Sequence, residues 1–100
     1  MELQSEGNSE VTAVVPALNE AATVGAVVET LRGSGRVSRI IVVDDGSSDR
    51  TAEAAQRAGA EVLCLPENRG KGHALAAGVA QSESEIILFA DADLTGFTAD

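Results

Sequence analysis

The chain has 100 residues, a formal net charge of −9 at pH 7 and an apolar content of 44%, with two Phe and no Trp or Tyr. This length accommodates one small domain and is short for an α/β enzyme. The acidic balance argues against a nucleic-acid partner, because binding to a phosphate backbone depends on clustered Lys and Arg.

The sequence contains no candidate membrane span, since no segment approaches the roughly 18 consecutive apolar residues that a span needs. The first ten residues are polar and acidic, unlike a basic leader followed by an apolar core. They show no periodicity and predict a disordered lead-in over residues 1–10, so the domain is expected over residues 11–100. We expect a cytoplasmic protein, or one peripheral to a membrane.

Four apolar runs alternate with segments of helical periodicity along the chain. They end near residues 15, 43, 65 and 90, at intervals of 22 to 28 residues. This spacing is typical of βα units that feed a parallel sheet. Since crossovers between parallel strands are right-handed, few arrangements remain, and we expect a three-layer, Rossmann-like parallel sheet of order 3-2-1-4 with flanking helices.

The first connecting segment predicts an amphipathic helix that starts after Asn19 and stops at Gly33. Asn19 is the expected N-cap residue. The apolar stripe of this helix recurs at i, i+3, i+4 and i+7 and consists of Val24, Val27, Val28 and Leu31.

Two further helices are expected, over residues 48–58 and 73–81. The first has a narrow Ala-rich face and ends at Gly59, which suits a left-handed stop. The second contains Gly78, which lowers its expected regularity.

Three of the apolar runs lead into acidic or polar loops, over residues 16–20 (PALNE), 44–47 (DDGS) and 91–93 (DAD). The carboxyl ends of parallel strands meet at one edge of the sheet, where ligands bind at the reversal of strand order. In the order 3-2-1-4 this reversal lies between the first and fourth strands. Carboxylates that converge there repel one another unless a cation or a donor-rich ligand lies among them.

Asp91 and Asp93 are the candidate metal ligands. Two carboxylates at i and i+2 beyond a strand end can point toward one ion, and hard oxygen ligands suit Mg²⁺ or Mn²⁺. The alternative is that the two side chains cap the start of a following helix.

The pair Asp44 and Asp45 is expected to divide its roles. Gly46 permits a tight turn that one carboxylate can stabilise, and the other can accept a hydrogen bond from a uracil or guanine N–H or from a ribose hydroxyl. Asp45 is the preferred ligand contact.

The remaining polar segments are less specific. The loop over residues 16–20 lacks glycine, which excludes a dinucleotide fingerprint, and Glu20 is favourable at a helix N-terminus on dipole grounds alone. Residues 68–72 (NRGKG) do not form a Walker A motif; they suit either a diphosphate or a solvated turn. His73 is expected at the surface.

In order and at natural spacing, residues 14–20 (VVPALNE), 42–49 (VVDDGSSD), 68–72 (NRGKG) and 91–93 (DAD) resemble the nucleotide-binding half of family 2 glycosyltransferases with the GT-A fold. The resemblance covers residues 10–95 and is greatest to polyprenyl (dolichyl) phosphate mannose and glucose synthases and to glucosyl-3-phosphoglycerate synthases. It implies a nucleotide-sugar site, with a metal held by Asp91 and Asp93, formed by Pro16, Leu18, Glu20, Val43, Asp45, Lys71, Asp91 and Ala92. Leu18 departs from the family pattern, since many relatives have Tyr there.

The resemblance also implies an activity. A UDP- or GDP-linked sugar would be transferred, with Mg²⁺ or Mn²⁺, to an acceptor such as a polyprenyl phosphate or a small molecule. The catalytic base is expected beyond Asp100, so the domain over residues 11–100 is expected to be truncated. Two alternatives stay open: a non-catalytic fragment that binds nucleotide and metal, and a haloacid-dehalogenase-like phosphatase, whose D-x-D-x-T motif residues 91–95 also fit with Asp91 as nucleophile.

Overall fold

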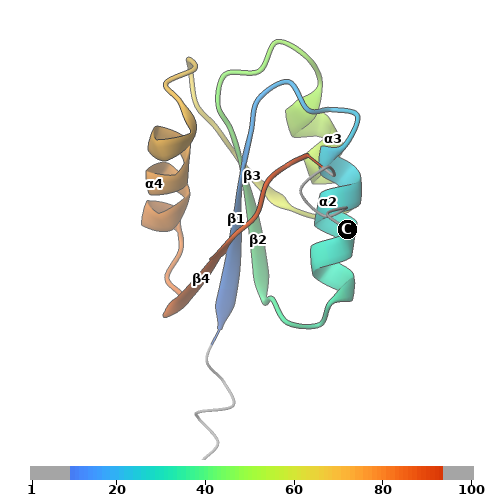
Figure 1. Cartoon of the computed structure of the whole chain (residues 1–100), viewed down its shortest axis with the longest axis vertical. Helices are drawn as coiled ribbons and strands as arrows, with labels where there is room; N and C mark the ends of the chain where they lie inside the picture. Colours follow the sequence, from blue (N-terminus) through green and yellow to red (C-terminus); the bar gives the residue numbers. More distant parts are fainter. Residues whose placement is uncertain (1–9, 94–100) are drawn as a thin grey trace, which may run out of the picture.

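The computed structural model describes residues 10–93 as a parallel sheet between layers of helices (Figure 1). The expected lead-in, apart from Glu10, and the stretch after Asp93 lie outside the described residues. In chain order the elements are β1 (Val11–Ala17), α2 (Val24–Gly33), β2 (Arg39–Asp44), α3 (Thr51–Ala58), β3 (Glu61–Cys64), α4 (Lys71–Gln81) and β4 (Ile86–Phe89).

The sheet has the order β3-β2-β1-β4, and all neighbouring strands are parallel. This confirms the strand order expected from the spacing of the apolar runs. The register places Pro16 beside Val43 on β2, and Val14 beside Phe89 on β4. The carboxyl ends of the four strands therefore meet at one edge, which is the upper edge in Figure 1.

Helices α2 and α3 cover one face of the sheet, and α4 covers the other (Figure 1). Successive residues of a strand point to opposite faces, so Val15 packs in the core on the α2 side and Val14 in the core on the α4 side. A strand that is covered on both faces has a nearly continuous apolar sequence, which explains the apolar runs of β1 and β2. None of the three described helices combines the length and apolarity that crossing a membrane requires.

Gly78 lies where α4 approaches the sheet most closely. A Cβ atom built on it would lie 2.4 Å from Cγ1 of Val14 and 3.0 Å from Cγ2 of Val43. The helix expected over residues 73–81 is confirmed: α4 begins two residues earlier and runs unbroken through Gly78, from Lys71 to Gln81. The cost of glycine in a helix is offset by close packing of α4 on β1 and β2.

This contact predicts that Gly78→Ala destabilises the protein. The added methyl group must push α4 from the sheet, and overpacking of this kind costs about 1–3 kcal/mol of unfolding free energy. Gly72→Ala is the matched control, because it lies in the same helix with no atom within 4 Å of its added Cβ, and alanine favours helix. Urea unfolding of both variants measures the difference; equal stabilities would contradict the close approach.

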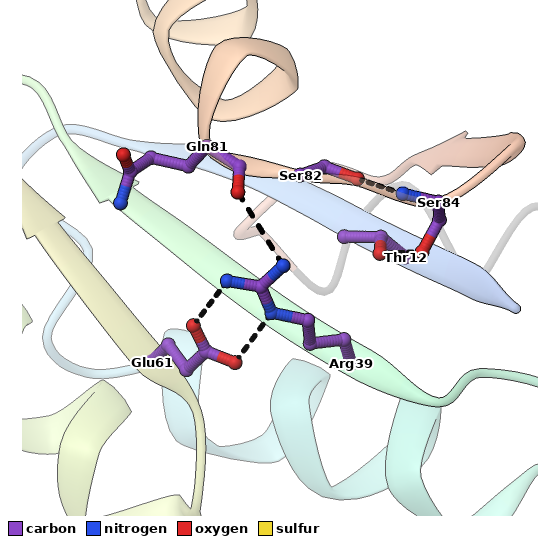
Figure 2. Close-up of polar contacts among 6 residues, drawn as sticks. All are labelled: Thr12, Arg39, Glu61, Gln81, Ser82 and Ser84. Atoms are coloured by element: carbon purple, nitrogen blue, oxygen red, sulfur yellow. Dashed lines mark hydrogen bonds and ion pairs between the residues drawn. The ribbon is translucent and has the colours of Figure 1, made fainter.

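The amino edge of the sheet is held by a polar cluster drawn in Figure 2. Arg39 on β2 donates to both carboxylate oxygens of Glu61 on β3, at 2.8 and 2.9 Å, and to the carbonyl of Gln81 at the end of α4, at 3.4 Å. Thr12 on β1 shares a 2.5 Å hydrogen bond with the hydroxyl of Ser84, in the segment before β4. These contacts fasten the end of the sheet opposite the polar loops.

The Arg39 pair makes stability depend on pH. The hydrogen bond from Arg39 lowers the pKa of Glu61 below its usual range, so the stabilisation is present above the unfolded-state pKa of about 4.3 and is lost as the pH falls through the folded-state value. Because both side chains are partly exposed, we expect a few tenths of a kcal/mol. In Glu61→Gln the unfolding free energy should decrease less between pH 5 and pH 3 than in the wild type. The exposed control Glu85→Gln should show the same decrease as the wild type.

Candidate functional site

Two cavities of about 210 Å³ each open at the carboxyl end of β1 and share Pro16 and Lys71 in their walls. The cavity on the β2 side, here the β1–β2 cavity, is lined by Pro16, Ala17, Leu18, Glu20, Asp45, Asn68, Gly70 and Lys71. The cavity on the β4 side, here the β1–β4 cavity, is lined by Pro16, Lys71, Leu75, Phe89, Ala90 and Asp91. The shared residues make the two cavities neighbours at the reversal of strand order.

Hydrogen bonds join the loops after β1 and β2, next to Leu18 and Glu20 of the β1–β2 cavity. The Asn19 N–H donates to Oγ of Ser47 at 2.8 Å, and Oδ1 of Asn19 accepts from the Ser48 N–H at 2.8 Å. The next residue continues the pattern, as the Glu20 N–H donates to Oγ1 of Thr51 at 2.8 Å. The two loops are therefore ordered together.

Asn19 is not the N-cap of the first helix, which corrects the sequence-based expectation. α2 begins at Val24, four residues beyond Glu20, and its N-cap residue is Thr23. Asn19 instead takes the left-handed conformation, with φ of 55°, which asparagine tolerates better than most residues. Its amide then faces the β2 loop, a partner that local sequence does not reveal.

Asp49 adds to this network. Oδ2 accepts from the Ala21 N–H at 3.2 Å, and Oδ1 accepts from both the N–H and the hydroxyl of Thr51. The Thr51 hydroxyl contributes most to lowering the pKa of Asp49 below its ordinary value, and the backbone N–H groups add to the effect. The charged form of Asp49 is the one that holds the loops together.

Substitution of Asn19 tests the loop network. Asn19→Ala removes the bonds to Ser48 and places a Cβ-bearing residue without a polar side chain at positive φ, so we expect a loss of about 1–2 kcal/mol of unfolding free energy. Asn19→Gly removes the same bonds but accepts positive φ freely, and should lose less. Urea unfolding separates the two effects; wild-type stability in Asn19→Ala would disprove the network.

Asp44 and Asp45 divide their roles, but both support the backbone. Asp44 is buried and accepts from the Ser47 N–H at 2.9 Å, which is the structural turn expected for one member of the pair. Asp45 is only 4% exposed and accepts from the N–H groups of Arg69 at 3.1 Å and Gly70 at 2.9 Å. Asp45 therefore lines the β1–β2 cavity and also holds the loop that precedes α4.

The turn at Gly46 makes this contact possible. Its φ is +80°, and an added Cβ would lie 2.7 Å from the backbone nitrogen of Asn68. The β2 loop and the loop before α4 thus touch backbone to backbone. Only glycine fits both the conformation and the space.

The acidic residues after β4 begin at the rim of the β1–β4 cavity. The side chain of Asp91 is 57% exposed, and its Oδ1 lies 3.1 Å from Nζ of Lys71. Ala92 is buried, and its carbonyl accepts a 2.6 Å hydrogen bond from Thr23 at the start of α2. This bond fixes the backbone between Asp91 and Asp93.

The donor chemistry of these residues fits a hard divalent cation. Within residues 10–93, no three His, Cys, Asp or Glu side chains gather as a complete metal cluster. Mg²⁺ is nevertheless commonly held by one or two carboxylates together with waters and substrate phosphates. Asp91 is exposed enough to contribute in this way, and Asp93, two residues further along the chain, is partly buried.

The structure brings together most of the eight residues predicted to form the nucleotide-sugar site. Five of them, Pro16, Leu18, Glu20, Asp45 and Lys71, line the β1–β2 cavity, and Asp91 lines the adjoining one. The other two, Val43 and Ala92, have buried side chains that pack in the core, so a ligand could meet only their backbone. His73 is exposed, as expected.

Sequence reasoning missed some of the lining. Leu75 and Phe89 form the apolar wall of the β1–β4 cavity, and Phe89 is 54% exposed although it belongs to an apolar run. Asn68 and Gly70, which belong to the segment predicted to suit either a diphosphate or a solvated turn, line the other cavity.

A parallel sheet of order 3-2-1-4 with paired cavities at its carboxyl edge defines the class of open α/β domains that bind ligands at the reversal of strand order. Comparison with known proteins identifies the family. The family model of Glycosyl transferase family 2 matches residues 12–95, and the chain belongs to this family.

Individual relatives agree with the family assignment. Glucosyl-3-phosphoglycerate synthase of Mycolicibacterium smegmatis is 43% identical over 93 residues, which cover 84% of this chain and 31% of that protein. Undecaprenyl-phosphate 4-deoxy-4-formamido-L-arabinose transferase of Pseudomonas paraeruginosa is 38% identical over 94 residues, covering 84% of this chain and 28% of the relative.

A solved structure matches the fold as well. Glucosyl-3-phosphoglycerate synthase from Mycobacterium tuberculosis, in complex with Mn²⁺, UDP and phosphoglyceric acid, superposes with a TM-score of 0.78 at 34% identity. The match covers 88% of this chain and 34% of that chain. The chain thus has the nucleotide-binding part of the GT-A fold and spans about a third of the length of these relatives. Membership of this family leaves the phosphatase alternative without support.

Proposed function

We propose that this chain binds the donor of a sugar-transfer reaction, a UDP-linked sugar, together with Mn²⁺ or Mg²⁺ at the carboxyl edge of β1. The observation that carries the proposal is the pair of adjoining cavities, which places Asp45 and Asp91 on either side of Lys71. The M. tuberculosis relative that matches this fold holds UDP and Mn²⁺. A GDP-linked donor is the alternative.

The β1–β2 cavity suits the nucleoside. Asp45 keeps acceptor capacity beyond its two backbone bonds, since an ionised carboxylate offers about four lone-pair sites. It can accept from the uracil N–H or a ribose hydroxyl, with Leu18 and Pro16 as the apolar wall. Glu20 offers a second acceptor, and one of its oxygens already lies 3.4 Å from the Leu18 backbone nitrogen.

The diphosphate and the metal belong between the two cavities. Lys71 supplies a positive charge reachable from both, and Asp91 and Asp93 would hold the cation. When bound, the cation neutralises the charge that develops on the diphosphate leaving group. The chain's own contribution is to fix the carboxylates, through the bond from Thr23 to the Ala92 carbonyl.

We propose that the acceptor and its catalytic base are supplied outside residues 10–93. The matched relatives differ in acceptor, since one crystal complex holds phosphoglyceric acid and another relative is named for undecaprenyl phosphate. Both acceptors carry a phosphate group. A phosphorylated acceptor, lipid or small molecule, is therefore the class we assign.

Calorimetric titration with UDP and with GDP, each with and without Mn²⁺, tests the donor site. We expect Mn²⁺-dependent binding of UDP. Asp93→Asn should weaken the Mn²⁺-dependent part at least about tenfold, because it removes a charged ligand, and Asp45→Asn should weaken binding about five- to tenfold with or without metal. The control Glu83→Gln removes an exposed charge at the opposite edge and should leave both affinities unchanged.

The outcomes separate the alternatives. Failure to bind either nucleotide would reject the donor site. Mn²⁺-dependent binding of GDP in place of UDP would favour the GDP-linked donor.

A further inference from the structure

Three consecutive residues connect the two carboxylates that the proposed function assigns to nucleoside and metal. Arg69 and Gly70 donate their backbone N–H groups to Asp45, and the next residue, Lys71, places Nζ 3.1 Å from Oδ1 of Asp91. Since β2 and β4 flank β1, residues 69–71 bridge the carboxyl end of β1. We call them the bridging segment.

The backbone of the bridging segment is held by Asp45, whereas its lysine side chain is largely exposed. Asp45 is nearly buried and holds the backbone one residue before Lys71. The Lys71 side chain is 65% exposed and lines both cavities. Rotation about the side-chain bonds of Lys71 can therefore move its ammonium group from one cavity toward the other while the backbone stays in place.

The ammonium and a divalent cation would compete for the same carboxylate. In the structure Nζ of Lys71 lies at Asp91, where it neutralises charge at the rim of the β1–β4 cavity. A cation bound through Asp91 would meet a positive charge within a few ångströms, and like charges at such distances repel. Occupation of Asp91 by either group disfavours the other.

We propose that Lys71 is a placeholder for the divalent cation: it pairs with Asp91 until the donor diphosphate draws its ammonium away. This inference rests on the proposed function. The diphosphate offers Lys71 a stronger anionic partner than one carboxylate, and the released Asp91 can then bind the cation. Nucleotide and metal therefore bind cooperatively, and each raises the affinity of the other by the same factor.

The weakness of the pair suits this role. Exposed ion pairs contribute little free energy. The free energies measured for such pairs correspond to about a 1.5- to fivefold change in an equilibrium constant. A pair of this strength disfavours the metal alone without blocking the ternary complex.

Mn²⁺ binding to the full chain, measured from the electron paramagnetic resonance signal of free Mn²⁺, tests the proposal. Without nucleotide, Lys71→Met should bind Mn²⁺ about two- to fivefold more tightly than the wild type. With saturating UDP this gain should vanish, because Lys71 has already left Asp91 in the wild type. The affinity for UDP should fall in the same variant.

Arg69→Met is the matched control, because it removes the same charge from the same segment. The Arg69 guanidinium contacts Glu67 at 2.8 Å and lines neither cavity, and only its backbone N–H reaches Asp45. Its Mn²⁺ affinity should equal that of the wild type. Both substituted side chains are exposed, and far-ultraviolet circular dichroism checks that the fold is retained.

Three results would overturn the inference. They are an unchanged or weaker Mn²⁺ affinity in Lys71→Met, a gain that persists in saturating UDP, and an equal gain in Arg69→Met, which would indicate a general charge effect. Any of them leaves the proposed function standing if the wild type binds UDP with Mn²⁺. If the wild type binds no UDP, the proposed function itself fails.

Discussion

The parallel pairing of β1 with both β2 and β4 is the constraint on which the rest of the structure depends. The strand order reverses at β1, because β2 and β3 lie on one side of it and β4 lies on the other. The loops after β1 and β4 therefore leave the sheet side by side. The pairing needs a strand that is apolar on both faces, and β1 is buried from Thr12 to Ala17. The polar residues that follow β1 are thereby placed beside those that follow its two neighbours.

Close packing and hydrogen bonding then convert this edge into a defined site. Gly78 lets α4 approach β1 and β2, and this carries Lys71, at the start of the same helix, to the edge of the sheet. Buried polar groups must find partners. Asp45 satisfies this requirement by accepting hydrogen bonds from the backbone of the bridging segment. It thereby connects the wall of the β1–β2 cavity to Lys71, which also lines the β1–β4 cavity.

Two cations of this acidic chain form ion pairs at opposite edges of the sheet. Arg39 joins β2, β3 and α4 at the amino edge (Figure 2), and Lys71 meets Asp91 at the carboxyl edge. The first pair is bidentate and structural. The second is a single exposed contact, weak enough to be exchanged for a ligand.

The sequence by itself determined the α/β class, the strand order and the edge at which polar residues gather. These follow from periodicity, from the spacing of apolar runs and from the right-handedness of crossovers, which are local or general rules. The resemblance of four motifs to a known family added the prediction of which residues form the site. Six of the eight predicted nucleotide-sugar residues line the two cavities.

Only the tertiary structure decided what individual side chains contact. Asn19 bonds to the β2 loop rather than capping α2, Asp45 supports a loop 24 residues away, and Val43 is core rather than cavity wall. Each outcome depends on a partner distant in the chain, and periodicity carries no information about such pairs. Gly78 shows the same limit, because a residue that weakens an isolated helix is required once that helix must lie against a sheet.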